Sequence, residues 1–309
     1  MSPESLSDAI KQEGQRLGFD MLGIAKAEMM DKEAYDLEKW LEAGRHGSMQ
    51  YMENYFDKRV DPRKLVEGAK SVISVIHNYY PDQKDTFPEG GPKISRYAWG
   101  EDYHKVLKKK LYTLFRWIHE QVGAEVEGRV FVDSAPVMDK AWARRSGLGW
   151  IGKHTNLISP QRGSYFFIGE IILDLELAYD GPIKDFCGTC TRCIDACPTD
   201  ALAPYEMDAN KCISYLTIEL KDAMNAEQSQ QLEGWAYGCD ICQEVCPWNR
   251  FSRSHGEEFK PLGHHAMSAQ EWEEIDERAF KKLTKKTAMN RVKWDKMKSN
   301  LFWWQQNQP

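Results

Sequence analysis

The sequence of 309 residues contains no apolar run of the length that a membrane-spanning segment needs. Its first residues, MSPESLSDAIKQEGQRLGFD, lack the basic flank and the apolar stretch of a signal peptide. We therefore expect a cytoplasmic protein that makes no membrane contact, and we expect a monomer.

Two common nucleotide-binding motifs are also missing. Neither G-x-x-x-x-G-K-[ST] nor G-x-G-x-x-G occurs, so nucleotide hydrolysis and nicotinamide binding both lose support. Disulfide bonds are not expected either. Seven of the eight cysteines lie in two short runs, and in a reducing compartment such runs favour metal ligands.

The sequence does contain an alternation of helical and strand patterns. Helical spacing marks residues 6–17 and 102–123, and strand patterns mark 20–27, 71–80, the segment that ends at Asp133, and 164–177. We therefore expect an α+β fold with three parts. These are an α/β-type catalytic domain at residues 1–180, a bacterial ferredoxin-like domain at 181–253 and a basic, mainly helical segment at 254–309.

The first cysteine run has the spacing of a bacterial ferredoxin. It reads C-x2-C-x2-C-x3-C-P, in which three cysteines bind one cubane and the fourth ligates another. The second run supplies only three cysteines, the last of them again followed by proline. Cys212 is the one cysteine left to complete it. We therefore predict two [4Fe–4S] clusters, one held by Cys187, Cys190, Cys193 and Cys246, and the other by Cys197, Cys212, Cys239 and Cys242.

Structural zinc is the alternative for these cysteines. Zinc sites use C-x2-C pairs too, but the C-x3-C-P endings have no rationale in a tetrahedral site. Two cubanes form a one-electron relay, and the residues that precede them should hold whatever consumes the electrons.

Two places in the N-terminal part carry candidate chemistry. Asp133 follows a predicted strand, where ligand-facing residues of α/β folds lie, and it could donate a proton; a turn or helix-capping aspartate is the equal alternative. The segment from Gly147 to Ile158 is too rich in glycine and too polar for a core. It resembles a loop that approaches a ligand through its backbone, although His154 alone would more often be a structural hydrogen bonder.

A basic segment lies near the C-terminus of a chain whose net charge is −6. Such a local basic face can hold a polyanion, and a solvated lysine-rich helix is the alternative. Between Phe280 and Asn300 its cations are Lys281, Lys282, Lys285, Lys286, Arg291, Lys293, Lys296 and Lys298.

Four blocks together resemble epoxyqueuosine reductase, the cobalamin-dependent iron–sulfur enzyme of the last step of queuosine synthesis in tRNA. They are SRYAWGEDYHKVLKKKL, VDSAPVMDKAWARRSGLGWIGKHTNLIS, FCGTCTRCIDACPTDAL and YGCDICQEVCPWN. The resemblance runs to about residue 300. Many family members continue into a HEAT-like helical domain, whereas this sequence ends in NLFWWQQNQP, so we expect a short form.

The resemblance implies functions for particular residues. Asp133 matches the aspartate of the family's DS-x-P motif and would be the proton donor while cobalt attacks the epoxide. The resemblance also implies base-off cobalamin, and because no D-x-H-x-x-G stretch occurs, a histidine lower ligand of that kind is not expected. Tyr97, His154, Leu157 and Asp240 would contact it. The substrate would be tRNA with a GUN anticodon, and the basic segment would bind it.

Two other functions fit parts of the sequence. A reductive dehalogenase-like corrinoid enzyme would act on a small molecule, but such enzymes are usually exported with a twin-arginine signal. An electron-transfer subunit would not need the large N-terminal part. In each case a low-potential donor of flavodoxin or ferredoxin type would supply electrons.

Overall fold

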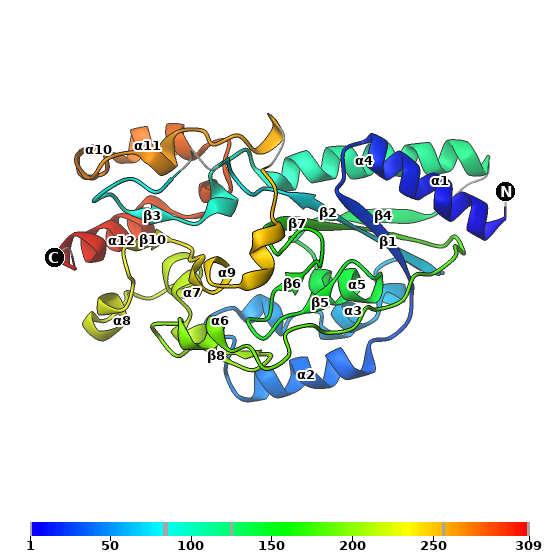
Figure 1. Cartoon of the computed structure of the whole chain (residues 1–309), viewed down its shortest axis with the longest axis horizontal. Coiled ribbons are helices and arrows are strands. Elements are labelled where there is room, and N and C mark those ends of the chain that lie inside the picture. Colours follow the sequence, from blue (N-terminus) through cyan, green and yellow to red (C-terminus); the bar gives the residue numbers. More distant parts are fainter. Residues whose placement is uncertain (1, 83–85, 124–125, 255–256, 308–309) are drawn as a thin grey trace.

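The computed structural model describes residues 2–82, 86–123, 126–254 and 257–307. A four-stranded sheet of order β1-β2-β7-β4 lies at its centre (Figure 1). Its strands are β1 (Met21–Lys26), β2 (Ser71–Asn78), β7 (Phe166–Leu173) and β4 (Gly128–Phe131).

All three strand pairings of this sheet are antiparallel. The α+β prediction is therefore confirmed, but the description of the N-terminal part as α/β-type is wrong, because that class has a mostly parallel sheet. The helices α2 (Asp31–Glu42) and α3 (Phe56–Val60) follow β1. The connection through these helices leaves β1 at Lys26 and enters β2 at Ser71, and these two residues are paired at the same end of the sheet. Strand β2 is therefore antiparallel to β1, although strands and helices alternate in the sequence.

Helices cover both faces of the sheet (Figure 1). On one face, α1 (Pro3–Arg16) and α4 (Tyr103–Val122) bury an apolar stripe against the strands. In α4 this stripe is Leu107, Leu111, Leu114 and Ile118, spaced as one side of a helix requires. On the other face, α5 (Asp139–Arg145) packs Trp142 against β2 and β7.

The predicted boundaries of α4 and β2 agree with the structure to within two residues. Asp102 caps α4 by accepting a hydrogen bond from the amide of His104, and Gly123 ends it in the left-handed region at φ 65°. None of the helices in the described ranges is both long and apolar enough to cross a membrane.

The cysteine region is built from short elements. They are α6 (Arg192–Asp195), β8 (Leu202–Ala203), β9 (Glu206–Met207), α7 (Ile213–Ile218), α8 (Ala226–Gln230), β10 (Trp235–Tyr237) and α9 (Ile241–Glu244). Strand β10 pairs in parallel with β3 (Lys93–Ile94). A segment that lies between β2 and α4 in the sequence thus becomes part of the cysteine region's support.

The C-terminal segment is mainly helical, with α10 (Ala269–Glu273), α11 (Glu277–Thr284) and α12 (Trp294–Gln306). It shares a core with the β3 and β10 segments, to which Phe280 and Trp304 contribute. The buried Asn300 amide donates to the carbonyls of Thr217 and Ala236, at 2.7 and 2.9 Å. These contacts fix α12 on the cysteine region, and the domain boundaries at 180 and 253 stay predictions.

Candidate active site

A cavity of about 500 Å³ lies where the N-terminal part, the cysteine region and the C-terminal segment meet. All three parts contribute to its lining. The predicted site residues found there are Tyr97, Asp133, His154, Arg291, Cys197, Cys212, Cys239 and Cys242.

Asp133 stands two residues beyond the end of β4. Its φ of 56° lies in the left-handed region, which is unfavourable for residues other than glycine but tolerated best by Asn and Asp. Its side chain is 46% exposed because it faces the open cavity. A non-glycine residue held in this conformation at a cavity wall is typical of a functional position.

Asp133 has two hydrogen-bond partners from the start of α4. The hydroxyl of Tyr103 donates to its Oδ2 at 2.7 Å, and His104 Nε2 lies 3.0 Å from the same oxygen. His104 Nδ1 in turn lies 2.7 Å from Oδ1 of Asp102. Since both ring nitrogens face carboxylates, a protonated His104 donates to both.

These contacts shift the proton affinities in opposite directions. Burial raises the pKa of Asp133, but hydrogen bonds from His104 and Tyr103 outweigh it and leave that pKa below its ordinary value. Burial lowers the pKa of His104, but hydrogen bonds to Asp133 and Asp102 outweigh it and leave that pKa raised. Between these two pKa values Asp133 is ionised and His104 carries the proton. A ligand that displaced water from the cavity would favour the neutral form of this pair, in which Asp133 carries the proton.

The glycine-rich segment forms a hairpin of β5 (Trp150–Ile151) and β6 (Leu157–Ile158). Its tip places His154 in the cavity wall, and the ring's Nδ1 accepts a hydrogen bond from the amide of Asn156 at 3.1 Å. Burial, with the nearby Lys140, lowers the pKa of His154 to about 4. The ring is therefore neutral, with its hydrogen on Nε2.

The buried Nε2 of His154 has no hydrogen-bond partner among the described residues. A buried donor without a partner is costly, so this atom calls for a ligand acceptor such as an amide oxygen. In this tautomer it does not coordinate a metal ion. The neighbouring Lys153 points elsewhere and donates to the carbonyls of Gly188 and Cys190, at 2.7 and 3.0 Å.

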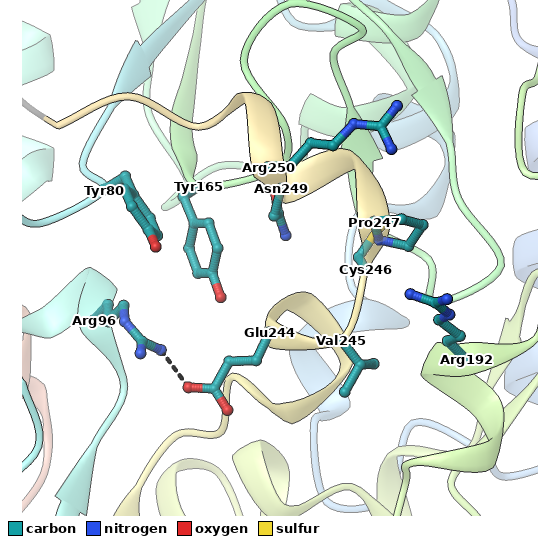
Figure 2. Close-up of a pocket in the computed structure, with 10 residues that line it drawn as sticks. All are labelled: Tyr80, Arg96, Tyr165, Arg192, Glu244, Val245, Cys246, Pro247, Asn249 and Arg250. Carbon is teal, nitrogen blue, oxygen red and sulfur yellow. Dashed lines mark hydrogen bonds and ion pairs between the residues drawn. The ribbon is translucent and has the colours of Figure 1, made fainter. Parts of the chain in front are cut away.

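The cysteines fall into two groups, which we call the inner set and the outer set. The inner set, Cys197, Cys212, Cys239 and Cys242, lines the cavity together with Asp133. In the outer set, Cys187, Cys190, Cys193 and Cys246, the residue Cys246 lines a second pocket of about 430 Å³ (Figure 2). This grouping agrees with the predicted ligand sets, which stay a prediction.

Single-ion zinc sites find no support in this geometry. Within the described ranges, no three His, Cys, Asp or Glu side chains converge as ligands of one metal ion, as tetrahedral zinc requires. A cubane binds each thiolate through a different iron atom, so its ligands stand further apart.

Two predicted cofactor contacts do not line the cavity. Asp240 is buried and accepts hydrogen bonds from the Ser95 hydroxyl at 2.5 Å and the Arg96 amide at 2.9 Å. Burial raises its pKa although Arg96 opposes this. Leu157 packs in a small core cluster with Ile76. Asp240 positions Ser95, which does line the cavity, and direct contacts of Asp240 and Leu157 with a cofactor stay predictions.

The cations of the basic segment lie in three different environments in the structure. Arg291 lines the cavity and pairs with Glu219 at 2.5 Å. Lys296 donates to the carbonyl of Leu216, and burial lowers its pKa to about 8. The exposed lysines are Lys281, Lys282, Lys285, Lys286, Lys293 and Lys298.

One exposed pair, Lys285 and Lys286, lies beside the site. The carbonyl of Lys286 accepts a hydrogen bond from the amide of Asp102 at 2.7 Å, directly before Tyr103 and His104. Lys281 instead pairs with Glu277 on its own helix.

Sequence reasoning missed several residues of the site. Tyr103 and His104 lie in one of the four blocks that resemble the family, but no function was predicted for them. Met49 and Tyr51 come from a segment for which no prediction was made. An aspartate before Tyr-His at a helix start is a detectable capping signal. Its link to Asp133 depends on tertiary contacts.

Comparisons with known proteins decide the family. The description "Epoxyqueuosine reductase QueG, DUF1730" matches residues 59–134, which include Asp133, and "4Fe-4S double cluster binding domain" matches 186–249, which include all eight cysteines. An epoxyqueuosine reductase of Leadbetterella byssophila is 56% identical over 96% of this chain and 97% of its own length. The chain belongs to the epoxyqueuosine reductase family. It is thus an oxidoreductase with a domain for two [4Fe–4S] clusters.

Solved epoxyqueuosine reductases share the fold. One, in complex with an epoxyqueuosine-modified tRNA-Tyr stem loop, matches with a TM-score of 0.87 at 28% identity, over 98% of this chain and 80% of that one. The Bacillus subtilis enzyme, with its catalytic aspartate loop swung out of the active site, also matches with a TM-score of 0.87, at 27% identity over 98% and 81%. A reductive dehalogenase matches with a TM-score of 0.52 at 18% identity, over 81% and 32%, a likeness in fold alone.

Proposed function

We propose that this protein reduces epoxyqueuosine to queuosine in tRNAs with a GUN anticodon, using cobalamin in the cavity and two [4Fe–4S] clusters as a relay. One observation carries the proposal: a single cavity holds Asp133 and all four thiols of the inner set. Membership of the epoxyqueuosine reductase family supports the same activity.

The cavity residues fit cobalamin. The unpartnered Nε2 of His154 is a donor for the amide-rich rim of a corrin, and Ser95, Thr155 and Asn156 add further polar groups to the lining. When bound, cobalamin supplies a strongly reducing, nucleophilic cobalt centre.

The reaction fixes what the protein's own residues must supply. Converting the epoxide to an alkene breaks both C–O bonds, consumes two electrons and two protons, and releases the oxygen as water. Asp133 faces the cavity and would give the first proton to the opening oxygen. His104, hydrogen-bonded to Asp133 and partly exposed, would return a proton to it from solvent.

The substrate would be held by aromatic rings and lysines. Tyr51, Tyr97 and Tyr103 line the cavity, and an extruded base stacks on such rings. The exposed Lys285 and Lys286 beside the start of α4 would bind phosphates of the anticodon stem. The protein would act as a cytoplasmic monomer, fed by a low-potential electron donor.

Anaerobic reconstitution with iron, sulfide and cobalamin tests this function. RNA containing epoxyqueuosine is then incubated with the protein and a strong reductant, and the nucleoside is analysed by mass spectrometry. We expect the loss of one oxygen mass, and no loss with protein reconstituted without cobalamin. An unchanged mass with fully loaded protein would remove the proposal.

A further inference from the structure

The two cysteine sets face different pockets. The inner set lines the cavity with Asp133. In the outer set, Cys246 lines the second pocket and Cys187 packs with it against Trp150 and Trp248. On the proposed function, the cavity is filled by cofactor and substrate during turnover. Electrons must then enter at the outer set.

An exposed aromatic surface adjoins the outer set. Phe186, directly before Cys187, is 48% exposed, and Phe251 is 37% exposed. Trp248 lies between them, with ring centroids 5.9 Å from Phe186 and 5.7 Å from Phe251. Trp150 packs against Trp248 at 4.9 Å. These rings form a continuous apolar path from the surface to Cys187 and Cys246.

Two exposed arginines flank this surface. Arg192 and Arg250 both line the pocket with Cys246, and Figure 2 shows Arg250 above Cys246 and Arg192 below and to its right. No ion pair of either is found among the described residues, whereas Arg96 in the same pocket pairs with Glu244 at 2.6 Å. The Arg250 guanidinium lies over the ring of its neighbour Phe251, 4.6 Å from the ring centroid.

The nearby exposed carboxylates of Asp185 and Asp195 keep their charge and accept hydrogen bonds from neutral groups of the same chain. Asp185 accepts hydrogen bonds from the Tyr205 hydroxyl and the Cys187 amide, both at 2.6 Å. Asp195 accepts one from the Thr191 hydroxyl at 2.8 Å. On a chain with net charge −6, a surface with two unpaired arginines beside a predicted cluster is an exception, and it suits a negatively charged partner.

We propose that the entry face, formed by Phe186, Arg192, Trp248, Arg250 and Phe251, is the docking surface for an acidic protein that carries a flavin with an exposed ring edge. This rests on the proposed function. The arginines would pair with carboxylates of the donor, and the aromatic rings would pack against the flat flavin. In each docking event a reduced flavin loses one electron and one cluster gains it, so two events supply one turnover.

Charge reversal tests the entry face. We would compare the native protein with the double variant Arg192→Glu/Arg250→Glu, each loaded with both clusters. The matched control is Lys109→Glu/Arg116→Glu, which reverses two exposed cations of α4. The probe is a bacterial flavodoxin, reduced photochemically and mixed anaerobically by stopped flow. Bleaching of the cluster absorbance is followed at several salt concentrations.

We expect the second-order rate constant to fall roughly tenfold or more in the Arg192/Arg250 variant, with a weaker dependence on salt. The control and the native protein should react alike. Phe251→Ser should also slow the reaction with flavodoxin, while dithionite, which needs no docking, should bleach all variants equally. Equal flavodoxin rates in the native protein and the double variant would overturn the proposal.

A reduced ferredoxin serves as a second probe. If only the ferredoxin rate responds to the arginine substitutions, the occupant is not a flavin protein and the proposal is wrong. Cluster bleaching needs no RNA. A failure of epoxyqueuosine reduction with dithionite would therefore count against the proposed function, whereas a failure confined to flavodoxin bleaching would count against the entry face.

Discussion

The inner and outer cysteine sets differ in their surroundings more than in their spacing. The inner set lies in the wall of the cavity, and burial raises the pKa of Cys212, Cys239 and Cys242, as it does for Cys193 and Cys246 of the outer set. It shares its cavity with Asp133. The outer set adjoins exposed rings and arginines, and the indole of Trp150 donates to Cys187 Sγ at 3.4 Å.

This difference assigns a direction to the relay. Burial affects cysteines of both sets and disfavours the added negative charge of a reduced cluster in each. A hydrogen bond to sulfur and nearby arginines favour it at the outer set. We therefore expect the outer cluster to have the higher potential and to accept electrons first, and the inner cluster to be the stronger reductant at the cavity.

Removing one cysteine ligand from each set should have the largest effect on turnover and should separate the functions of the two clusters. Cys242→Ala should abolish epoxyqueuosine reduction with every reductant, because the cluster at the cavity is lost. Cys187→Ala should abolish turnover with flavodoxin but leave slow turnover with titanium(III) citrate, which is small enough to reach the inner cluster. Iron analysis should show about half the native iron in each variant. Equal residual turnover in the two would mean that the sets are not ordered in series.

Asp133→Asn should give the next largest effect. Asparagine keeps the shape and tolerates the left-handed backbone, but it cannot donate a carboxyl proton, so turnover should fall about 10²- to 10⁴-fold. Bound cobalamin and iron, measured by absorbance, should not change. Asp200→Asn is the matched control, because Asp200 is an exposed aspartate that also has positive φ. Native turnover in the Asp133 variant would show that the proton comes from another group.

His104→Gln should slow turnover about tenfold at neutral pH and change its pH dependence. His104 has a raised pKa because of Asp133 and Asp102, although burial opposes this. Its proton is thus present below that pKa and lost as the pH rises through it, so native turnover should fall on the alkaline side. The variant should lack this limb. A rate loss with an unchanged pH profile would indicate a structural function only.

The contacts of His104 also mark the limit of what the sequence can predict. The cysteine spacing predicted two ligand sets, and the structure groups the same residues. Asp133 follows a predicted strand, where ligand-facing residues of α/β folds lie, yet the sheet is antiparallel. It lines the cavity because β4 ends early and its left-handed turn points it there. Tyr103, His104 and Arg291 could not be placed, because their contacts join segments at least 29 residues apart.

The double variant Lys285→Ala/Lys286→Ala tests whether RNA binds beside the cavity that the inner set lines. Losing two phosphate contacts should raise the Kd for an epoxyqueuosine-containing stem loop about three- to tenfold and reduce its salt dependence by about two units of slope. Lys109→Ala is the control, an exposed lysine on α4. Flavodoxin bleaching should be unaffected by the pair, and RNA binding should be unaffected by the Arg192/Arg250 variant. If either double variant changes both RNA binding and flavodoxin bleaching, the RNA-binding surface and the entry face are not separate.

Trp150→Phe should give the smallest effect, a shift in the reduction potential of the outer cluster alone. Phenylalanine keeps an aromatic ring beside Trp248 but removes the hydrogen bond to Cys187 Sγ. That bond stabilises the more negative, reduced cluster, so its loss should lower the outer potential by about 20–50 mV, the equivalent of roughly 0.5–1 kcal/mol for one electron. Redox titration followed by electron paramagnetic resonance measures both clusters. If the inner potential shifted instead, the placing of Cys187 in the outer set would be wrong, because Trp150 would then be acting on the cluster at the cavity.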